Sequence, residues 1–198
     1  EFWSFSYRRP RNYRRLVAQL VSKLKGGGGH VPYGIDDWYS RSLERRLAAL
    51  NDSDGPFDYV MVEYVFFSRA LHIFEGATKI IDTDDVFGDR HRKFIEQGLE
   101  PRWYYTTPER EAEGLRRADA VLAIQPHEKA YFSSLVPGTP VLHVGHLVAT
   151  EPAGTAPESP RRLLFLGGAN DVNVHALEHF LEQMWPQIAA SDAAVELD

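Results

Sequence analysis

The chain has 198 residues, of which 43% are hydrophobic, and a formal net charge of −6. The composition is typical of a globular protein, and the negative charge argues against nucleic acid as a partner. The absence of Cys excludes disulfides and thiolate metal sites, and no apolar run approaches the ~20 residues that span a bilayer.

A basic amphipathic helix is predicted over residues 11–25. Leu16, Val17, Leu20, Val21 and Leu24 form one stripe at helical spacing, and Arg and Lys side chains lie opposite. The favoured interpretation is a surface helix docked on the sheet. The alternative is contact of residues 2–25, including the aromatic Phe2, Trp3, Phe5 and Tyr7, with an anionic membrane surface.

Four glycines at 26–29 then interrupt the chain, either as a flexible loop or as an artificial join. A second helix is expected over 36–50, followed by a turn over 51–56. Strands and helices alternate after that. The expected strands are 57–62, 78–81, 120–124 and 140–144, and the expected helices are 66–74, 86–97, 108–118 and 126–135. This rhythm predicts an α/β fold, in which helices flank a Rossmann-like parallel sheet.

Residues 148–161 are rich in Ala, Pro, Thr and Glu, and are expected to be a linker. A strand over 163–166, a turn at Gly167-Gly168 and a helix from about 172 follow, with Pro186 expected to end or kink the helix. Another strand starts at 195. We therefore expect an N-terminal domain over 1–147, lacking its opening strand, and a truncated second Rossmann-like domain over 162–198.

Three carboxylates, Asp82, Asp84 and Asp85, follow the apolar strand that ends at Ile81. Ligands bind beyond the carboxyl ends of strands in open α/β sheets, so this is a candidate site. Asp82 and Asp84 could hold a divalent metal. They also have the spacing of the haloacid-dehalogenase phosphatase motif, in which Asp82 would attack phosphorus and Asp84 act as acid/base. A structural alternative is that Asp84 or Asp85 caps the next helix.

Crowded carboxylates need a metal, exposure to water or a basic partner such as Arg90 or Arg92. Glu63, at the end of the first strand, and His146, after the last strand of the first domain, are further candidates for a cleft. His91 is interpreted as a surface residue.

The Gly167-Gly168 turn meets a helix N-terminus, where backbone N–H groups favour an anion such as a diphosphate. A plain strand-to-helix turn is the alternative interpretation, with Asn170 and Asn173 as helix caps rather than ligands.

Several segments recur in an order that resembles the family 4 glycosyltransferases, which have the two-domain GT-B fold. These segments are Phe57-Asp-Tyr-Val-Met-Val-Glu63, Ile81-Asp-Thr-Asp-Asp85-Val-Phe, Leu115-Arg-Arg-Ala-Asp119 with Gln125-x-x-Glu128, Val141-x-x-Val144-Gly-His146, and Leu164-Phe-Leu-Gly167-Gly-x-Asn170-x-x-Asn173. The resemblance covers roughly residues 57–188.

The resemblance implies transfer of a sugar from a nucleotide-sugar to a glycan or lipid-linked acceptor, with retention and without a metal or other cofactor. It implies polysaccharide biosynthesis in the cytoplasm, with peripheral contact at the inner membrane face. Asp84 and Asp85 would be catalytic. The acceptor would meet Glu63, Asp82, Arg90 and His146, and the donor Gly167, Gly168, Asn170 and Asn173.

Two departures from the family pattern matter. Asp84 stands where family members often have His, and the donor-binding glutamate pair would lie beyond Asp198. The chain is therefore expected to be an incomplete and inactive portion. A phosphatase using Asp82 and Asp84, or a non-catalytic Rossmann-like binding module, remains the alternative.

Overall fold

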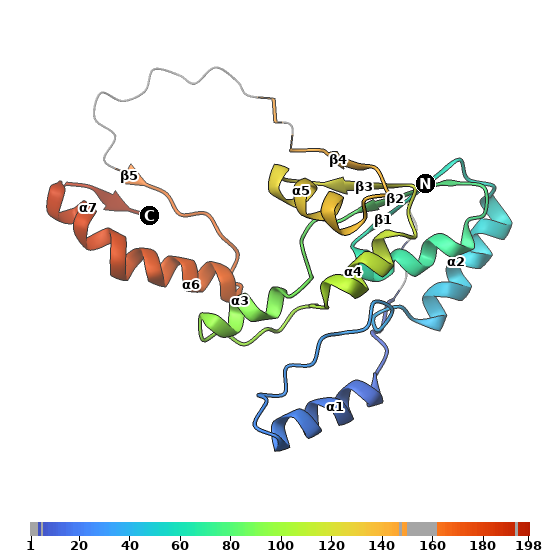
Figure 1. The fold of residues 1–198 in the computed structure, drawn as a ribbon. Helices are drawn as coiled ribbons and strands as arrows, with labels where there is room; N and C mark the ends of the chain where they lie inside the picture. Colours follow the sequence, from blue (N-terminus) through green and yellow to red (C-terminus); the bar gives the residue numbers. More distant parts are fainter. Residues whose placement is uncertain (1–3, 5, 147, 150–161, 193) are drawn as a thin grey trace. The chain divides into compact units, whose positions relative to one another are not determined.

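The computed structural model describes residues 4, 6–146, 148–149, 162–192 and 194–198. The chain divides into two compact units, Glu1–Leu147 and Val148–Asp198 (Figure 1). Phe2, Trp3 and Phe5 lie outside the described residues, and so does the predicted linker except for residues 148 and 149. No helix in the described part of the chain is long and apolar enough to cross a membrane.

The first unit alternates strands and helices, as predicted. Its elements are α1 (Tyr13–Leu24), α2 (Arg41–Asp54), β1 (Tyr59–Glu63), the 3-10 helix η1 (Val65–Ile73), β2 (Thr78–Asp82), α3 (Arg90–Glu96), α4 (Pro108–Leu115), β3 (Ala120–Ala123), α5 (Pro126–Leu135) and β4 (Val141–His143). The α/β class is therefore confirmed.

The four strands form one parallel sheet in the order β1-β2-β3-β4. Connections between parallel neighbours are almost always right-handed, so strands added in sequence order receive their helices on the same face. Ile81 and Val121 are fully buried on that face. On the opposite face, Tyr59 and Met61 are 71% and 60% exposed. The helices that pack on the sheet, η1 and α5, thus cover one side of it.

Local capping explains where two of the helices begin. The Ser40 side chain accepts a hydrogen bond from the Leu43 N–H, and Thr107 caps α4 in front of Pro108. The second helix was predicted from residue 36, but it begins at Arg41 because Asp37 instead accepts a bond from the Gly34 N–H at 2.7 Å. It also continues to Asp54, through part of the predicted turn.

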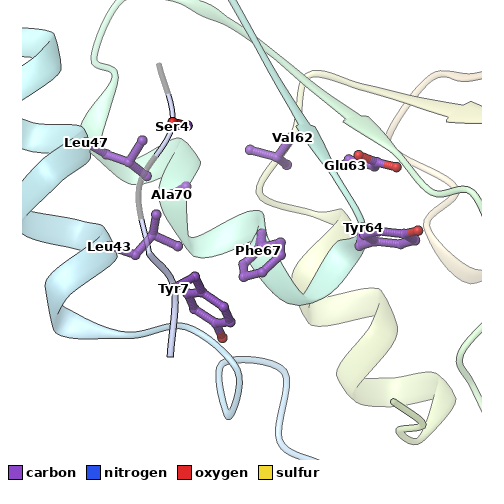
Figure 2. A pocket seen from close by; sticks show the side chains of 9 residues that line it. All are labelled: Ser4, Tyr7, Leu43, Leu47, Val62, Glu63, Tyr64, Phe67 and Ala70. Atoms are coloured by element: carbon purple, nitrogen blue, oxygen red, sulfur yellow. The ribbon is translucent and has the colours of Figure 1, made fainter. Parts of the chain in front are cut away.

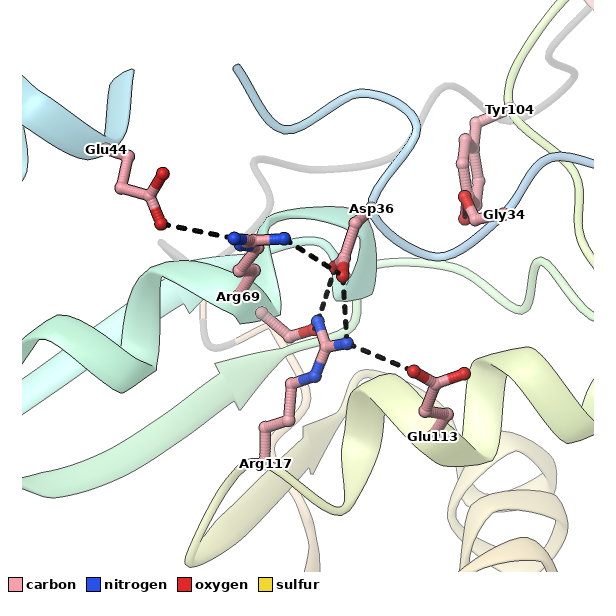
Figure 3. Close-up of polar contacts among 8 residues, drawn as sticks. Gly34, Asp36, Glu44, Arg69, Tyr104, Glu113 and Arg117 are labelled. Carbon is pink, nitrogen blue, oxygen red and sulfur yellow. Dashed lines mark hydrogen bonds and ion pairs between the residues drawn. The ribbon is translucent and has the colours of Figure 1, made fainter. Parts of the chain in front are cut away.

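An ion-pair network joins the segment before α2 to η1 and to the end of α4 (Figure 3). Asp36 receives two hydrogen bonds from Arg117, at 2.5 and 3.1 Å, and Arg117 also contacts Glu113 and the buried Ser68. Arg69 extends the network from Asp36 to Glu44. The bidentate geometry is the strong form of an Arg–carboxylate pair, so this network fixes the layer of helices against one another.

Helix α1 does not dock on the sheet through its apolar stripe, so the favoured interpretation was wrong. The stripe side chains Leu16, Val17, Leu20, Val21 and Leu24 are 54, 61, 60, 42 and 80% exposed. Arg15 instead faces the body of the unit, where its Nε donates to the Val31 carbonyl at 2.9 Å. The helix therefore turns a polar face inward and its apolar face outward.

The four glycines form a defined turn after α1. Gly26, Gly28 and Gly29 have φ values of 77°, 67° and 81°, a left-handed conformation that L-residues with side chains rarely adopt. The Gly26 and Gly27 N–H groups donate to the carbonyls of Lys23 and Ser22. The glycines thus end α1 and reverse the chain toward residue 33.

The second unit contains the short parallel strands β5 (Arg162–Leu163) and β6 (Glu196–Leu197). Between them run α6 (Asp171–His179), the π-helical segment η2 (Phe180–Met184) and α7 (Trp185–Ser191). Pro186 lies in the first turn of α7, directly after the π-helical segment. Proline has no N–H and collides with the carbonyl four residues back, which accounts for the local change of helix type.

Candidate functional site

Residues with a strained backbone lie at the carboxyl edge of the first sheet. Among the described residues, the non-glycine positions with positive φ are Tyr64 (67°), Asp84 (57°) and Asp89 (57°). Tyr64 directly follows β1, and the two aspartates lie in the loop after β2. Such conformations cost about 1–3 kcal/mol each and cluster at ligand-binding sites. Asp tolerates the left-handed region better than most residues because its side chain is short and polar.

The loop after β2 is held by long-range contacts. Buried Thr83 donates from its hydroxyl to the Leu122 carbonyl on β3 at 2.8 Å. Farther along, Phe87 and Thr106 are joined through their backbones, and the Asp89 N–H donates to the Thr106 carbonyl. The helix predicted from residue 86 therefore begins only at Arg90. The proposal that Asp84 or Asp85 caps this helix is wrong, because Asp89 is the residue that precedes it.

Glu111 is the most deeply buried acid near the site, and sequence reasoning missed it. Its carboxylate accepts the Phe87 and Gly88 N–H groups at 2.7 and 3.0 Å and the Tyr131 hydroxyl at 3.0 Å. Burial raises the pKa of Glu111 to about 7, although these hydrogen bonds oppose the shift. In the sequence it is one of two acids in the first turn of α4, a normal helix-start pattern that carries no signal for burial.

The loop carboxylates have different partners. Asp85 forms an ion pair with Arg90 and accepts the Val86 N–H at 3.1 Å. Asp84 is exposed, and it lies near the Tyr64 hydroxyl, whose pKa is raised to about 12 by burial first and then by its interaction with Asp84 and the other nearby carboxylates. Asp84 is thus open to a ligand, whereas Asp85 is engaged within the loop.

Glu63 and Asp82 lie side by side at the ends of β1 and β2. The strand register pairs them directly, so their side chains project from the same face of the sheet. Glu63 is exposed and Asp82 half-buried. Glu63, Asp82 and Asp84 thus place three carboxylates along one edge of the sheet. Arg90 lies near this edge because it forms an ion pair with Asp85. Arg92 pairs with Asp89 at 3.3 Å instead.

An apolar cavity of about 540 Å³ adjoins this edge (Figure 2). Leu43 and Leu47 of α2, Phe67 and Ala70 of η1 and Val62 of β1 form its walls. Glu63 and Tyr64 line the end nearest the sheet edge, and Tyr7 also lines the cavity, where its ring packs against Phe67. A ligand seated here would bring an apolar group into the cavity and a polar group to the carboxylates.

The two histidines considered earlier lie in different settings. His146 is exposed after β4, three strands from β1, so the strand ends are about 14 Å apart and His146 is not brought to Glu63. The prediction that His91 is a surface residue was wrong. The residue is 8% exposed, its ring stacks on Tyr105 with the ring centres 4.7 Å apart, and burial lowers the pKa of the imidazole.

The residues expected to bind the donor lie in the second unit. The Asn170 side chain caps α6 by accepting the Asn173 N–H at 2.9 Å, and the Asn173 amide donates to the Gly168 carbonyl at 2.9 Å. Gly167 packs against Phe165, where an added Cβ would lie 2.9 Å from the ring. The structure thus brings Gly167, Gly168, Asn170 and Asn173 together as a capped turn at a helix N-terminus.

Within the described ranges, no group of three His, Cys, Asp or Glu side chains is placed to hold a metal ion. Comparison with known proteins gives no match to a family model, to a curated protein or to a solved structure. The resemblance to glycosyltransferases therefore stays a prediction, and only the α/β architecture is observed directly.

Proposed function

We propose that the protein is a glycosyltransferase of the GT-B type that moves a sugar from a nucleotide-sugar to an acceptor. The observation that carries the proposal is the strained carboxyl edge of the first sheet, where Tyr64 and the nearby Asp84 both have a left-handed backbone. Strain of this kind is retained where it positions groups for a ligand.

The proposed acceptor site combines the carboxylate edge with the adjoining cavity. Glu63, Asp82 and Asp84 offer acceptors for sugar hydroxyls, and Arg90 holds Asp85 in place. Asp84 is the candidate for contact with the reacting hydroxyl, because it is exposed and lies at the strained edge beside Tyr64. The donor diphosphate would bind the turn at Gly167 and Gly168, with Asn170 and Asn173 shaping that turn.

The cavity supports a lipid-linked acceptor over a free glycan. Its walls of Leu, Val, Phe and Ala side chains match a hydrocarbon chain, and they end at Glu63 and Tyr64. The outward-facing apolar stripe of α1 supports the related proposal that this unit lies on an anionic membrane surface.

The test is transfer of labelled sugar from nucleotide-sugars to a lipid extract by the whole gene product. Asp84→Asn keeps the size of the side chain and its tolerance of positive φ, but removes the charge. We expect it to lower transfer roughly 10- to 100-fold, the usual worth of a hydrogen bond to a charged group. Product identity is checked by mass spectrometry.

Asp89→Asn is the matched control, because Asp89 has the same left-handed backbone but pairs with Arg92. It should keep most of the wild-type rate. Equal rates for wild type and Asp84→Asn would contradict the assigned role. Release of phosphate from phosphomonoesters, lost in Asp82→Asn, would favour a phosphatase instead.

A further inference from the structure

A second, polar cavity of about 400 Å³ lies between α1, the glycine turn and residues 100–105. Its charged and polar walls come from Arg15, Gln19 and Lys23 on α1, His30 after the glycine turn, and Glu100. The proposed function uses none of these residues, so this cavity is a separate feature of the first unit.

The positively charged guanidinium of Arg15 lines this cavity and is held in one position. Its Nε donates to the Val31 carbonyl at 2.9 Å and a terminal nitrogen donates to the Tyr105 hydroxyl at 3.1 Å. The guanidinium carbon lies 3.4 Å from the centre of the Tyr33 ring, a cation–π contact. These contacts hold the positive charge in one position before any ligand arrives, which lowers the entropic cost of binding.

Lys23 is held at the cavity by the glycine turn. A Cβ on Gly29 would lie 2.5 Å from Lys23 Cε, and Gly29 has a φ of 81°, so a larger residue would displace the lysine chain. Within the described residues the Lys23 ammonium has no ion-pair partner. Its charge is therefore available to a ligand.

The charges around the cavity favour an anion. Arg15 and Lys23 carry two positive charges, His30 adds a third donor group, and Glu100 is the carboxylate among the lining residues. The Gln19 amide supplies another donor. Several donors around one concave site match a group with several charged oxygens, and phosphate fits this description better than a single carboxylate.

We infer that this cavity is a binding site for a phosphate group, independent of the proposed transferase activity. The phosphate could belong to a soluble ester or to a lipid headgroup. The lipid source is geometrically accessible because Leu16 and Leu20, at the rim of the cavity, begin the exposed apolar stripe of α1. The chemistry at the site is the same in both cases.

The test uses Lys23→Gln and Lys25→Gln in the whole gene product. Both remove one positive charge from the end of α1, but Lys25 does not line the cavity. Binding of inorganic pyrophosphate is measured by calorimetry, and binding to mixed phosphatidylcholine and phosphatidic acid vesicles by co-sedimentation. Circular dichroism confirms that each variant is folded.

We expect Lys23→Gln to weaken phosphate binding about tenfold or more, and Lys25→Gln to weaken it less than about twofold. Glu100→Gln should tighten binding, because it removes the opposing charge. Binding of pyrophosphate identifies a soluble source, and binding of vesicles alone identifies a lipid headgroup. Equal losses in the two lysine variants, or no binding of either probe by the wild type, would overturn the inference.

Discussion

The buried carboxylate of Glu111 fixes the position of the candidate catalytic loop. It accepts two consecutive backbone N–H groups, from Phe87 and Gly88, and thereby holds the segment that follows Asp84 and Asp85. Gly88 is required at this point, since an added Cβ would lie 2.7 Å from a Glu111 oxygen and 2.4 Å from the Tyr131 hydroxyl. The loop conformation therefore depends on residues that lie more than 20 positions away.

The raised pKa of Glu111 predicts a pH-dependent stability. Its folded-state pKa of about 7 lies above the ordinary value of 4.5, so between these values the folded state binds more protons than the unfolded state. Stability due to this group is full below pH 4.5 and is lost as pH rises through 7. Glu111→Gln removes this titration. As pH rises from 4.5 to 8, the free energy of unfolding of the wild type, measured relative to that of the variant, should therefore fall by up to about 3 kcal/mol.

Urea unfolding at several pH values between 4.5 and 8 measures this difference. Glu113→Gln is the control, because Glu113 lies on the same helix and is exposed. The Glu113 variant should follow the pH curve of the wild type. Parallel curves for wild type and Glu111→Gln would show that Glu111 does not titrate in this range.

At the scale of elements, α1 is amphipathic but its apolar face is turned outward. A docked surface helix would place Leu16, Leu20 and Leu24 in the core, yet Arg15 makes the contacts with the body of the unit. Hydrogen bonds and stacking of one Arg side chain thus set the orientation of the whole helix. The apolar stripe is thereby left exposed.

Replacing Leu20 and Leu24 together by Gln tests whether the apolar stripe of α1 binds lipid or is buried against other protein groups. Both side chains are mostly exposed, so the free energy of unfolding should change by less than about 0.5 kcal/mol. Binding to anionic vesicles should fall about tenfold or more, since burial of each Leu is worth about 1.5–3 kcal/mol. Vesicle co-sedimentation and urea unfolding provide the two measurements.

Ala18→Gln is the control for this pair, because Ala18 is an exposed position of α1 outside the apolar stripe. It should bind vesicles as the wild type does. A large loss of stability in the Leu20, Leu24 variant would mean that the stripe is buried by protein, and an equal loss of binding in Ala18→Gln would mean that the stripe has no special role.

At the scale of the whole molecule, the described core belongs to the first unit. The buried hydrophobic side chains found in the described residues all lie between Ile35 and Val141. The helices of the second unit have no buried residue among those described. Hydrophobic burial is the main driving force of folding, so the first unit should fold without the second.

A fragment of residues 1–146 should therefore unfold cooperatively, with a melting temperature within about 3 °C of that of the first unit in the whole chain. Near-ultraviolet circular dichroism follows the aromatic core of this unit during heating. A shorter fragment, 1–138, removes β4 with buried Val141 and should melt at a clearly lower temperature. A non-cooperative transition in the 1–146 fragment would show that the second unit contributes to this core.

Sequence by itself was sufficient for the order of strands and helices in the first unit. Thr107-Pro108 marked the start of α4, and the apolar runs before Asp82 and after Asp119 marked β2 and β3. These signals are local, because caps and side-chain periodicity act within a few residues. The carboxyl edge with Glu63, Asp82 and Asp84 could also be predicted, since parallel strands end at a common edge.

Only the tertiary structure decided the details that depend on distant residues. Helix α3 begins only at Arg90, because Glu111 and Thr106 bind the backbone of the segment before it. His91 is buried against Tyr105. Arg15 turns the polar side of α1 toward the body of the unit. The polar cavity beside Lys23 follows from that orientation. A periodic pattern shows that a helix has two faces, but which face is buried depends on the partner that packs against it, and that partner is distant in the sequence.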